Sequence, residues 1–144
     1  MQHPPYYDLV LLIERLHRRF LDLLKAELSR LGIEDITNVQ ALILYNLGDE
    51  VLTVGDLTTR GYYQGTNVSY SVEKMVENGY LLREPSPHDK RSVRVRASDK
   101  GTTLRSRLQA LMERQAVTMT PAGISAEDMT RAAKVLGALE RAWA

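Results

Sequence analysis

The apolar residues of this chain follow a helical period everywhere except in one short stretch. Up to Gly79 they recur three or four positions apart, which is the spacing of one face of an α-helix. Ser92–Ala97 instead alternates valine with arginine, as a half-buried strand does, and Tyr80–Arg83 is a second extended run. Helical spacing returns after Ser98. The chain is therefore predicted to be mainly α with a small β-hairpin.

Capping residues predict where the helices begin and end. The first helix follows Pro5 and is ended by Gly32, a residue suited to the left-handed backbone of a helix C-terminus. Thr37 and Gln40 have the spacing of a capping box, which places a second helix at about 38–47. Further helices are expected at about 53–60, 66–79, 98–119 and from 125 onward, with one short strand at 51–52.

The connector between the two extended runs carries positive charge. Its two prolines, Pro85 and Pro87, exclude a helix, so the segment is predicted to form the protruding tip of a hairpin. Arg83–Arg96 contains five basic and two acidic residues, although the formal net charge of the chain is only +1. Residues 31–59 hold five acidic residues and no lysine or arginine. The near-neutral total therefore hides a basic hairpin, which suits a polyanionic partner.

A helical unit followed by a hairpin, over residues 37–97, is the order of a winged helix-turn-helix. In that arrangement one helix enters the major groove of DNA, which is about 12 Å wide, and the hairpin reaches the flanking backbone or minor groove. The helix at 66–79 can turn its valines toward the core, so that polar side chains face away. An ordinary solvated helix face is the alternative. The expected DNA-binding residues of this recognition helix are Thr66, Asn67, Ser69, Tyr70 and Lys74.

The hairpin supplies the second set of candidate DNA contacts. Arg94 and Arg96 alternate with valines and are expected to share the outward face of their strand. An exposed basic tip can enter a narrow minor groove, where the negative potential is enhanced. Asp89 is expected to pair with a nearby arginine and stabilise the wing, although an edge strand protected by its charges is the alternative interpretation. The candidate wing residues are His88, Lys90, Arg91 and Arg94.

Several segments resemble the MarR family of bacterial transcriptional regulators. They are Leu52–Leu57, Thr66–Ser69, Val76–Leu81, Pro87–Val93 and Ser98–Gly101, and the wing motif Pro-x-Asp-Lys-Arg is fairly specific. The resemblance spans nearly the whole chain and implies a homodimer that binds pseudo-palindromic operators. It also implies that Thr66, Asn67, Ser69 and Tyr70 enter the major groove and that Arg91 enters the minor groove. The chain departs from the family pattern at Tyr70, at Ser86 and in the glycine- and tyrosine-rich stretch 61–65.

The two ends of the chain are expected to form the dimer. Residues 1–36 and 98–144 carry leucine-rich stripes that are too long and too apolar for a solitary winged domain. Intertwining with a second copy would bury them and set two recognition helices about 34–36 Å apart; a monomer with a compact helical cap is the alternative. The family resemblance further implies a small aromatic or amphiphilic effector near the dimer helices, although aromatic residues there also suit an ordinary core. The candidate effector-pocket residues are Tyr6, Tyr7, His17, Phe20 and Tyr45.

Other classes of function fit the sequence poorly. The absence of cysteine excludes disulfides, zinc–thiolate sites and thiol redox sensing. The three histidines are scattered and no phosphate-cradling glycine loop is evident, so neither an enzyme nor a bound cofactor or metal is expected. His17 and Glu14 share a helix face but supply at most two metal ligands. The longest aliphatic run, Leu9–Ile13, is far shorter than the ~20 residues of a membrane helix, so no membrane partner is expected and a cytoplasmic protein is predicted.

These residues predict a transcriptional regulator that binds specific sequences of double-stranded DNA. The family resemblance favours a ligand-responsive repressor, because a dimer seated on a promoter blocks polymerase. An activator of the same fold is one alternative. A winged-helix module that binds protein instead of DNA is another, although it would call for an apolar or acidic recognition face.

Overall fold

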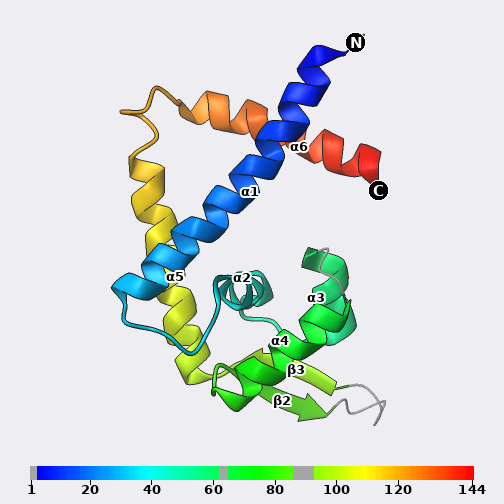
Figure 1. The fold of residues 1–144 in the computed structure, drawn as a ribbon, viewed down its shortest axis with the longest axis vertical. Coiled ribbons are helices and arrows are strands. Elements are labelled where there is room, and N and C mark those ends of the chain that lie inside the picture. The colour runs from blue at the N-terminus through cyan, green and yellow to red at the C-terminus, as the bar shows by residue number, and fades with distance from the viewer. Residues whose placement is uncertain (1–2, 62–64, 86–92) are drawn as a thin grey trace. The chain divides into compact units, whose positions relative to one another are not determined.

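The computed structural model describes residues 3–61, 65–85 and 93–144, and these are mainly helical, as predicted (Figure 1). The chain divides into two compact units, Met1–Leu108 and Gln109–Ala144, which are described separately. This division does not coincide with the functional boundaries expected at residues 36 and 97, which stay a prediction. The elements are α1 (Pro4–Arg30), α2 (Asn38–Leu47), β1 (Leu52–Thr53), α3 (Val54–Gly61), α4 (Gly65–Glu77), β2 (Leu81–Pro85), β3 (Val93–Ala97), α5 (Asp99–Val117) and α6 (Ala126–Trp143).

Helix ends follow the capping residues that the sequence indicated. At α2, the Thr37 hydroxyl accepts a hydrogen bond from the Gln40 backbone N–H at 3.1 Å, and the Gln40 side chain accepts one from the Thr37 N–H at 3.1 Å. The same reciprocal pairing opens α6 at Ser125 and Asp128. Gly32, beyond the end of α1, has a positive φ of 70°, which glycine adopts without a steric penalty. These three helices therefore begin or end where their backbone groups find local partners.

The sheet has three strands where the sequence predicted a hairpin and a separate short strand. All pairings are antiparallel and the order is β1-β3-β2. In the hairpin Leu81 lies opposite Ala97, and on the other side of β3 Leu52 lies opposite Val95. The short strand begins at Leu52, one residue later than expected, and it covers an edge of β3 that would otherwise present unpaired backbone groups.

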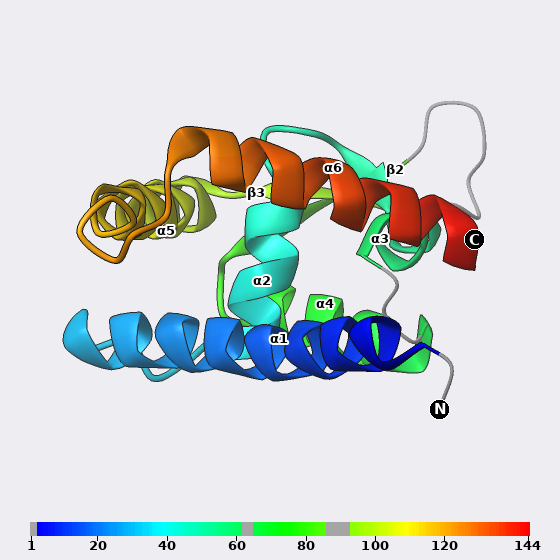
Figure 2. The same cartoon turned by 90° about the horizontal axis from the view of Figure 1, so that it is seen from above.

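The core of unit 1 is centred on α2. Ala41, Leu44 and Leu47 on this helix are fully buried. Figure 2 shows α2 crossing α1, and the Asn38 side chain of α2 donates to the Leu21 carbonyl of α1 at 3.2 Å. Each fully buried leucine contributes about 1.5–3 kcal/mol through the apolar area it removes from water. Other apolar side chains buried in this core are Leu24, Leu28, Leu57, Val68, Val72, Met75, Leu81, Val95, Leu104 and Leu108.

The N-terminal half of α1 does not share in this core. Leu11, Leu12 and Leu16 are each about half exposed, and none of the first 20 residues of α1 is buried. Unit 2 contains the end of α5 and the whole of α6, and no residue of α6 is buried either. Both units therefore present apolar side chains that the described part of one chain leaves exposed.

Candidate nucleic-acid interface

Helix α4 has a buried apolar face and an exposed polar face. Val68, Val72 and Met75 are almost fully buried, as the sequence pattern predicted. Asn67, Ser69 and Tyr70 are exposed, and Tyr70 retains 63% of its accessible surface. The first half of α4 therefore presents hydrogen-bonding groups to solvent, in the manner of a helix that reads a DNA groove.

Ser71 lies on the buried side of α4, at 9% exposure. The backbone of Thr66 lies in α4, but its side chain is outside the described residues.

Lys74 contacts two other side chains of its own helix. Its Nζ lies 3.3 Å from a carboxylate oxygen of Glu77 and 5.9 Å from the centre of the Tyr70 ring. These contacts hold the ammonium group beside the exposed face and neutralise the acidic residue that follows it. Since both partners of the ion pair are about half exposed, the pair is worth little in stability and can open toward a phosphate.

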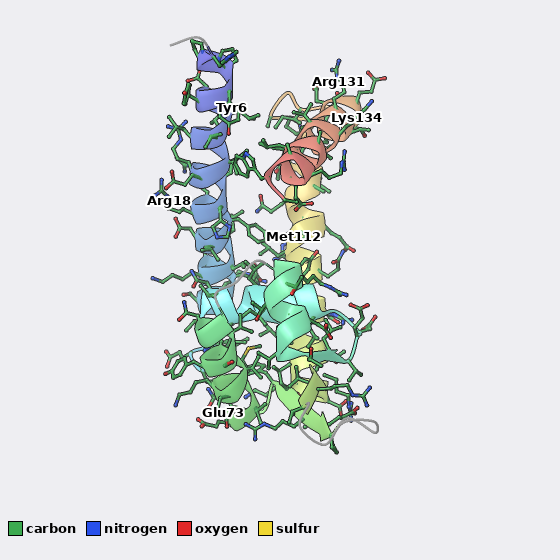
Figure 3. All side chains as sticks on the ribbon, turned by 90° about the vertical axis from the view of Figure 1, so that its right-hand side faces the viewer. Tyr6, Arg18, Glu73, Met112, Arg131 and Lys134 are labelled. Atoms are coloured by element: carbon green, nitrogen blue, oxygen red, sulfur yellow. The ribbon has the colours of Figure 1, made fainter. Side chains whose placement is uncertain are left out.

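Glu73 is paired with a cation from the sheet. Its side chain projects from α4 (Figure 3) and accepts a hydrogen bond from Arg83 on β2. That hydrogen bond, together with the charge of Arg83, lowers the pKa of Glu73. The pair joins α4 to β2 and offsets the acidic charge of Glu73.

At the described base of the wing, one arginine forms an ion pair and another is half-buried. Arg96 is exposed and donates to Glu84 on the neighbouring strand. Arg94, expected to point outward with Arg96, is only partly exposed, because it lies between Thr53 on β1 and Glu84 on β2. Within the described ranges its Nε is buried without a hydrogen-bond partner. The other predicted wing residues, His88, Asp89, Lys90 and Arg91, lie outside the described residues.

A polar cluster that the sequence did not reveal holds the end of α4. We call it the Asp35 cluster; it consists of Asp35, Asn78, Tyr80 and Lys100. The Tyr80 hydroxyl donates to Asp35 at 2.5 Å, and Lys100 Nζ donates to Asp35 at 2.9 Å and to the Asn78 carbonyl at 2.8 Å. The Asn78 side chain donates to the Asp35 carbonyl at 2.9 Å, and Lys100 lies 4.3 Å from the centre of the Tyr80 ring. Three segments distant in sequence therefore meet at one carboxylate.

The Asp35 cluster shifts two pKa values. Hydrogen bonds from Tyr80 and then from Lys100 lower the pKa of Asp35. Burial, followed by the hydrogen bond to Asp35, raises the pKa of Tyr80. No local pattern could have indicated this cluster, because its members are separated by as many as 65 positions.

The start of α5 fits tightly against the turn after α4. A Cβ atom added to Gly101 would lie 2.2 Å from the Tyr80 carbonyl oxygen, which no real side chain tolerates. The Ser98 hydroxyl accepts from the Gly101 N–H at 3.0 Å and donates to the Gly79 carbonyl at 2.5 Å. Lys100 and Gly101 thus serve different purposes, since Lys100 donates to Asp35 and Gly101 leaves room for the Tyr80 carbonyl.

The predicted effector residues lie outside one pocket formed by described residues of unit 1. Tyr6 and Tyr7 are exposed on the first turns of α1, with ring centres 5.7 Å apart (Figure 3 labels Tyr6). His17 is exposed, while Phe20 and Tyr45 are half-buried. A pocket of about 550 Å³ in unit 1 lies instead between the end of α1 and the start of α5. The placement of an effector at the five predicted residues rests on the family resemblance and stays a prediction.

Comparison with known proteins identifies the family of this chain. Residues 36–101 match a winged helix DNA-binding domain. The exopolysaccharide II synthesis transcriptional activator ExpG of Rhizobium meliloti (strain 1021) is 37% identical over 138 residues, which are 96% of this chain and 71% of that protein. The chain belongs to the MarR family of winged helix-turn-helix transcriptional regulators.

Solved MarR structures have the same fold. A mutant MarR from E. coli complexed with operator DNA superposes with a TM-score of 0.75 at 21% identity, covering 95% of this chain and 96% of that one. Staphylococcus aureus MarR in complex with salicylate and kanamycin gives a TM-score of 0.78 at 18% identity, covering 96% and 91%. The predicted fold and family are therefore confirmed.

The MarR family consists of transcriptional regulators, so this chain is a DNA-binding regulator and not an enzyme. Over the ranges that the structure describes, three or more acidic or histidine side chains nowhere gather as they would around a metal ion. In the same ranges, every helix is too short or too polar to span a membrane.

Proposed function

We propose that this MarR-family protein acts as a homodimer on a pseudo-palindromic operator, reading bases through α4 and flanking DNA through the wing. The observation that carries the proposal is the exposed face of α4, where Asn67, Ser69 and Tyr70 stand opposite a buried apolar face. An asparagine suits a bidentate contact with adenine, and serine and tyrosine hydroxyls suit phosphates or base edges.

The exposed apolar faces support the homodimer. The N-terminal half of α1 and the whole of α6 contain no buried residue, although both carry leucines. Monomeric proteins rarely leave large contiguous apolar patches exposed, and a second copy supplies a matching surface by symmetry. Two copies related by a two-fold axis would place two recognition helices about one turn of DNA apart.

DNA binding tests the proposal directly. Duplex DNA from the promoter of the protein's own gene is titrated with the protein at several salt concentrations, beside a scrambled duplex of equal length. We expect tighter binding to the promoter duplex, and affinity that falls steeply with salt as counterions are released. Equal binding to both duplexes, or none, would favour the alternative of a winged-helix module that binds protein.

Whether the protein represses or activates transcription depends on where the dimer binds relative to the promoter. Steric exclusion of polymerase favours repression when the operator overlaps the promoter. The similarity to ExpG, an activator by name, favours activation as a second candidate. In vitro transcription from the bound promoter separates the two, because the transcript decreases in one case and increases in the other.

A response to a small molecule completes the proposed function. The Staphylococcus aureus MarR whose fold this chain shares was solved in complex with salicylate and kanamycin, which supports an effector of small size. The chain lacks cysteine, so a response through thiol oxidation is excluded.

A further inference from the structure

One large apolar side chain is exposed on the face of α4 that is proposed to read DNA. Of the described side chains of this helix, Tyr70 is the only large hydrophobic one that is exposed, whereas Val68 and Val72 are almost fully buried. Tyr70 lies two positions from each of these valines, which is about 200° around a helix of 3.6 residues per turn. Its side chain therefore stands close to the middle of the exposed face, at a position where the chain departs from the family pattern.

The Tyr70 ring is flanked by a cation from its own helix. The ammonium group of Lys74, about one turn later, lies 5.9 Å from the ring centre, within the range of a cation–π contact. The same ammonium group lies 3.3 Å from a carboxylate oxygen of Glu77, which further limits its movement. A ring restrained in this way loses less conformational freedom when it is buried against a partner.

The spacing of Asn67 and Tyr70 matches a step along DNA. Asn67 lies about one turn before Tyr70 and is also exposed. Residues three positions apart on a helix have Cβ atoms about 5–6 Å apart, and consecutive base pairs are about 3.4 Å apart. With Asn67 on an adenine, Tyr70 therefore meets base edges one or two base pairs away. The apolar group among the major-groove edges is the C5 methyl group of thymine, which is the natural partner for an aromatic ring.

We propose that the ring of Tyr70 determines specificity by packing on the C5 methyl group of a pyrimidine in the operator, which is thymine in unmodified DNA. This contact rests on the proposed function, because it requires α4 to lie in the major groove. It differs from a hydrogen bond to a base edge, since it reads the methyl group and not the neighbouring oxygen or nitrogen. Because 5-methylcytosine carries the same methyl group, an operator with cytosine at this position should bind more tightly when that cytosine is methylated.

The first test removes the methyl group from DNA one base at a time. Each thymine of the promoter duplex is replaced in turn by deoxyuridine, which lacks only the C5 methyl group, and affinity is measured by fluorescence anisotropy. We expect about fourfold weaker binding at one position, as the exposure of a group of this size predicts. The loss should persist in Tyr70→Phe, which keeps the ring, and disappear in Tyr70→Ala.

The ratio of affinities for the thymine and uracil duplexes decides the outcome for each variant. The methyl contact is refuted if no replacement weakens wild-type binding, if the loss is unchanged in Tyr70→Ala, or if it is absent from Tyr70→Phe. A wild-type protein that prefers the promoter duplex to a scrambled one but tolerates every replacement leaves the proposed function standing. A protein without that preference refutes both. Since Tyr70 is exposed, urea unfolding should show that both variants are as stable as the wild type.

The second test adds the methyl group to a different base. At the sensitive position the thymine–adenine pair is replaced by cytosine–guanine, with and without a methyl group on C5 of the cytosine. Other contacts change equally in both duplexes, so their comparison isolates the methyl group. We expect methylation to tighten binding of the wild type and of Tyr70→Phe about fourfold and to leave Tyr70→Ala unaffected. Equal wild-type affinity for the two duplexes would contradict the proposal.

Discussion

At the residue scale, single side chains in this protein have separable tasks. Asn67 is exposed on α4, Gly101 permits a close backbone contact, and Asp35 accepts hydrogen bonds from distant segments. Each task depends on a different physical property, namely hydrogen-bonding pattern, absence of a Cβ, and charge. Each can therefore be tested by a substitution that removes only that property.

Asn67→Ala should weaken binding at one base position of the operator. A bidentate contact between asparagine and adenine discriminates by about 1–3 kcal/mol, so the loss should appear for the preferred base and vanish for the other three. Titration against a set of operator variants measures it, with Thr130→Ala on α6 as the control. Uniform weakening on every duplex would show that Asn67 contacts only phosphate.

Gly101→Ala should destabilise the fold by about 1–3 kcal/mol, as overpacking against a rigid neighbour does. The clash is with the backbone of Tyr80, which cannot rotate away. Gly137→Ala on α6 is the matched control, because only a flexible arginine lies near its Cβ, at 3.5 Å. This control should be stabilising by about 0.5–1 kcal/mol, as alanine usually is in a helix interior. Urea unfolding of both variants checks the opposite signs.

The Asp35 cluster should make the free energy of unfolding depend on pH below about pH 4, where aspartate side chains ordinarily titrate. The folded-state pKa of Asp35 is lowered, so its contribution is complete above the unfolded pKa and is lost as the pH falls through the folded pKa. Asp35→Asn should cost about 1 kcal/mol at pH 7, since the group is half exposed, and the cost should disappear in acid. Urea unfolding across pH, with Asp22→Asn on α1 as the control, measures this difference. A cost that stays constant down to pH 2 would contradict it.

At the element scale, local signals and long-range contacts differ in how far the sequence predicts them. The start of α2 followed from Thr37 and Gln40, because a cap is decided within four residues. The pairing of β1 with β3 was not predicted, since it joins positions about 40 apart and a two-residue strand has no periodicity to detect. For the same reason the polar face of α4 was predicted while its ion pair with Arg83 was not.

Glu73→Gln should increase DNA affinity severalfold without changing sequence preference. The substitution removes an acidic charge from α4 and releases Arg83, which can then neutralise a phosphate. The plot of log affinity against log salt should steepen by about one charge, on the order of 0.9 in slope. Glu140→Gln on α6 provides the control, and an unchanged slope would place Glu73 away from DNA.

At the scale of the whole molecule, the exposed apolar faces of α1 and α6 are the main unexplained surface of the single chain. A second copy is the occupant we propose. Sequence periodicity revealed these stripes because leucines at helical spacing mark a face whatever covers it. It could not reveal what covers them, because intrachain and interchain packing use the same pattern.

Leu16→Glu should weaken or dissociate the proposed dimer and reduce DNA affinity in parallel. Leu16 is 58% exposed in the single chain, so a charge there leaves the core intact while opposing burial by a partner. Lys25→Glu is the control, because nine residues along a helix is the opposite side of α1. Light scattering after size exclusion should give twice the 16.3 kDa chain mass for wild type and control. A wild-type mass of one chain at micromolar concentration would rule out the proposed dimer.

The Asp35 cluster also has a consequence for the order of events during synthesis. Its carboxylate appears early in the chain, yet the ammonium group that binds it belongs to residue 100. A ribosome-bound fragment that ends with β3 contains the whole recognition helix but neither Lys100 nor the glycine that packs on Tyr80. Helix α4 therefore acquires its final support only when the first turn of α5 has left the exit tunnel.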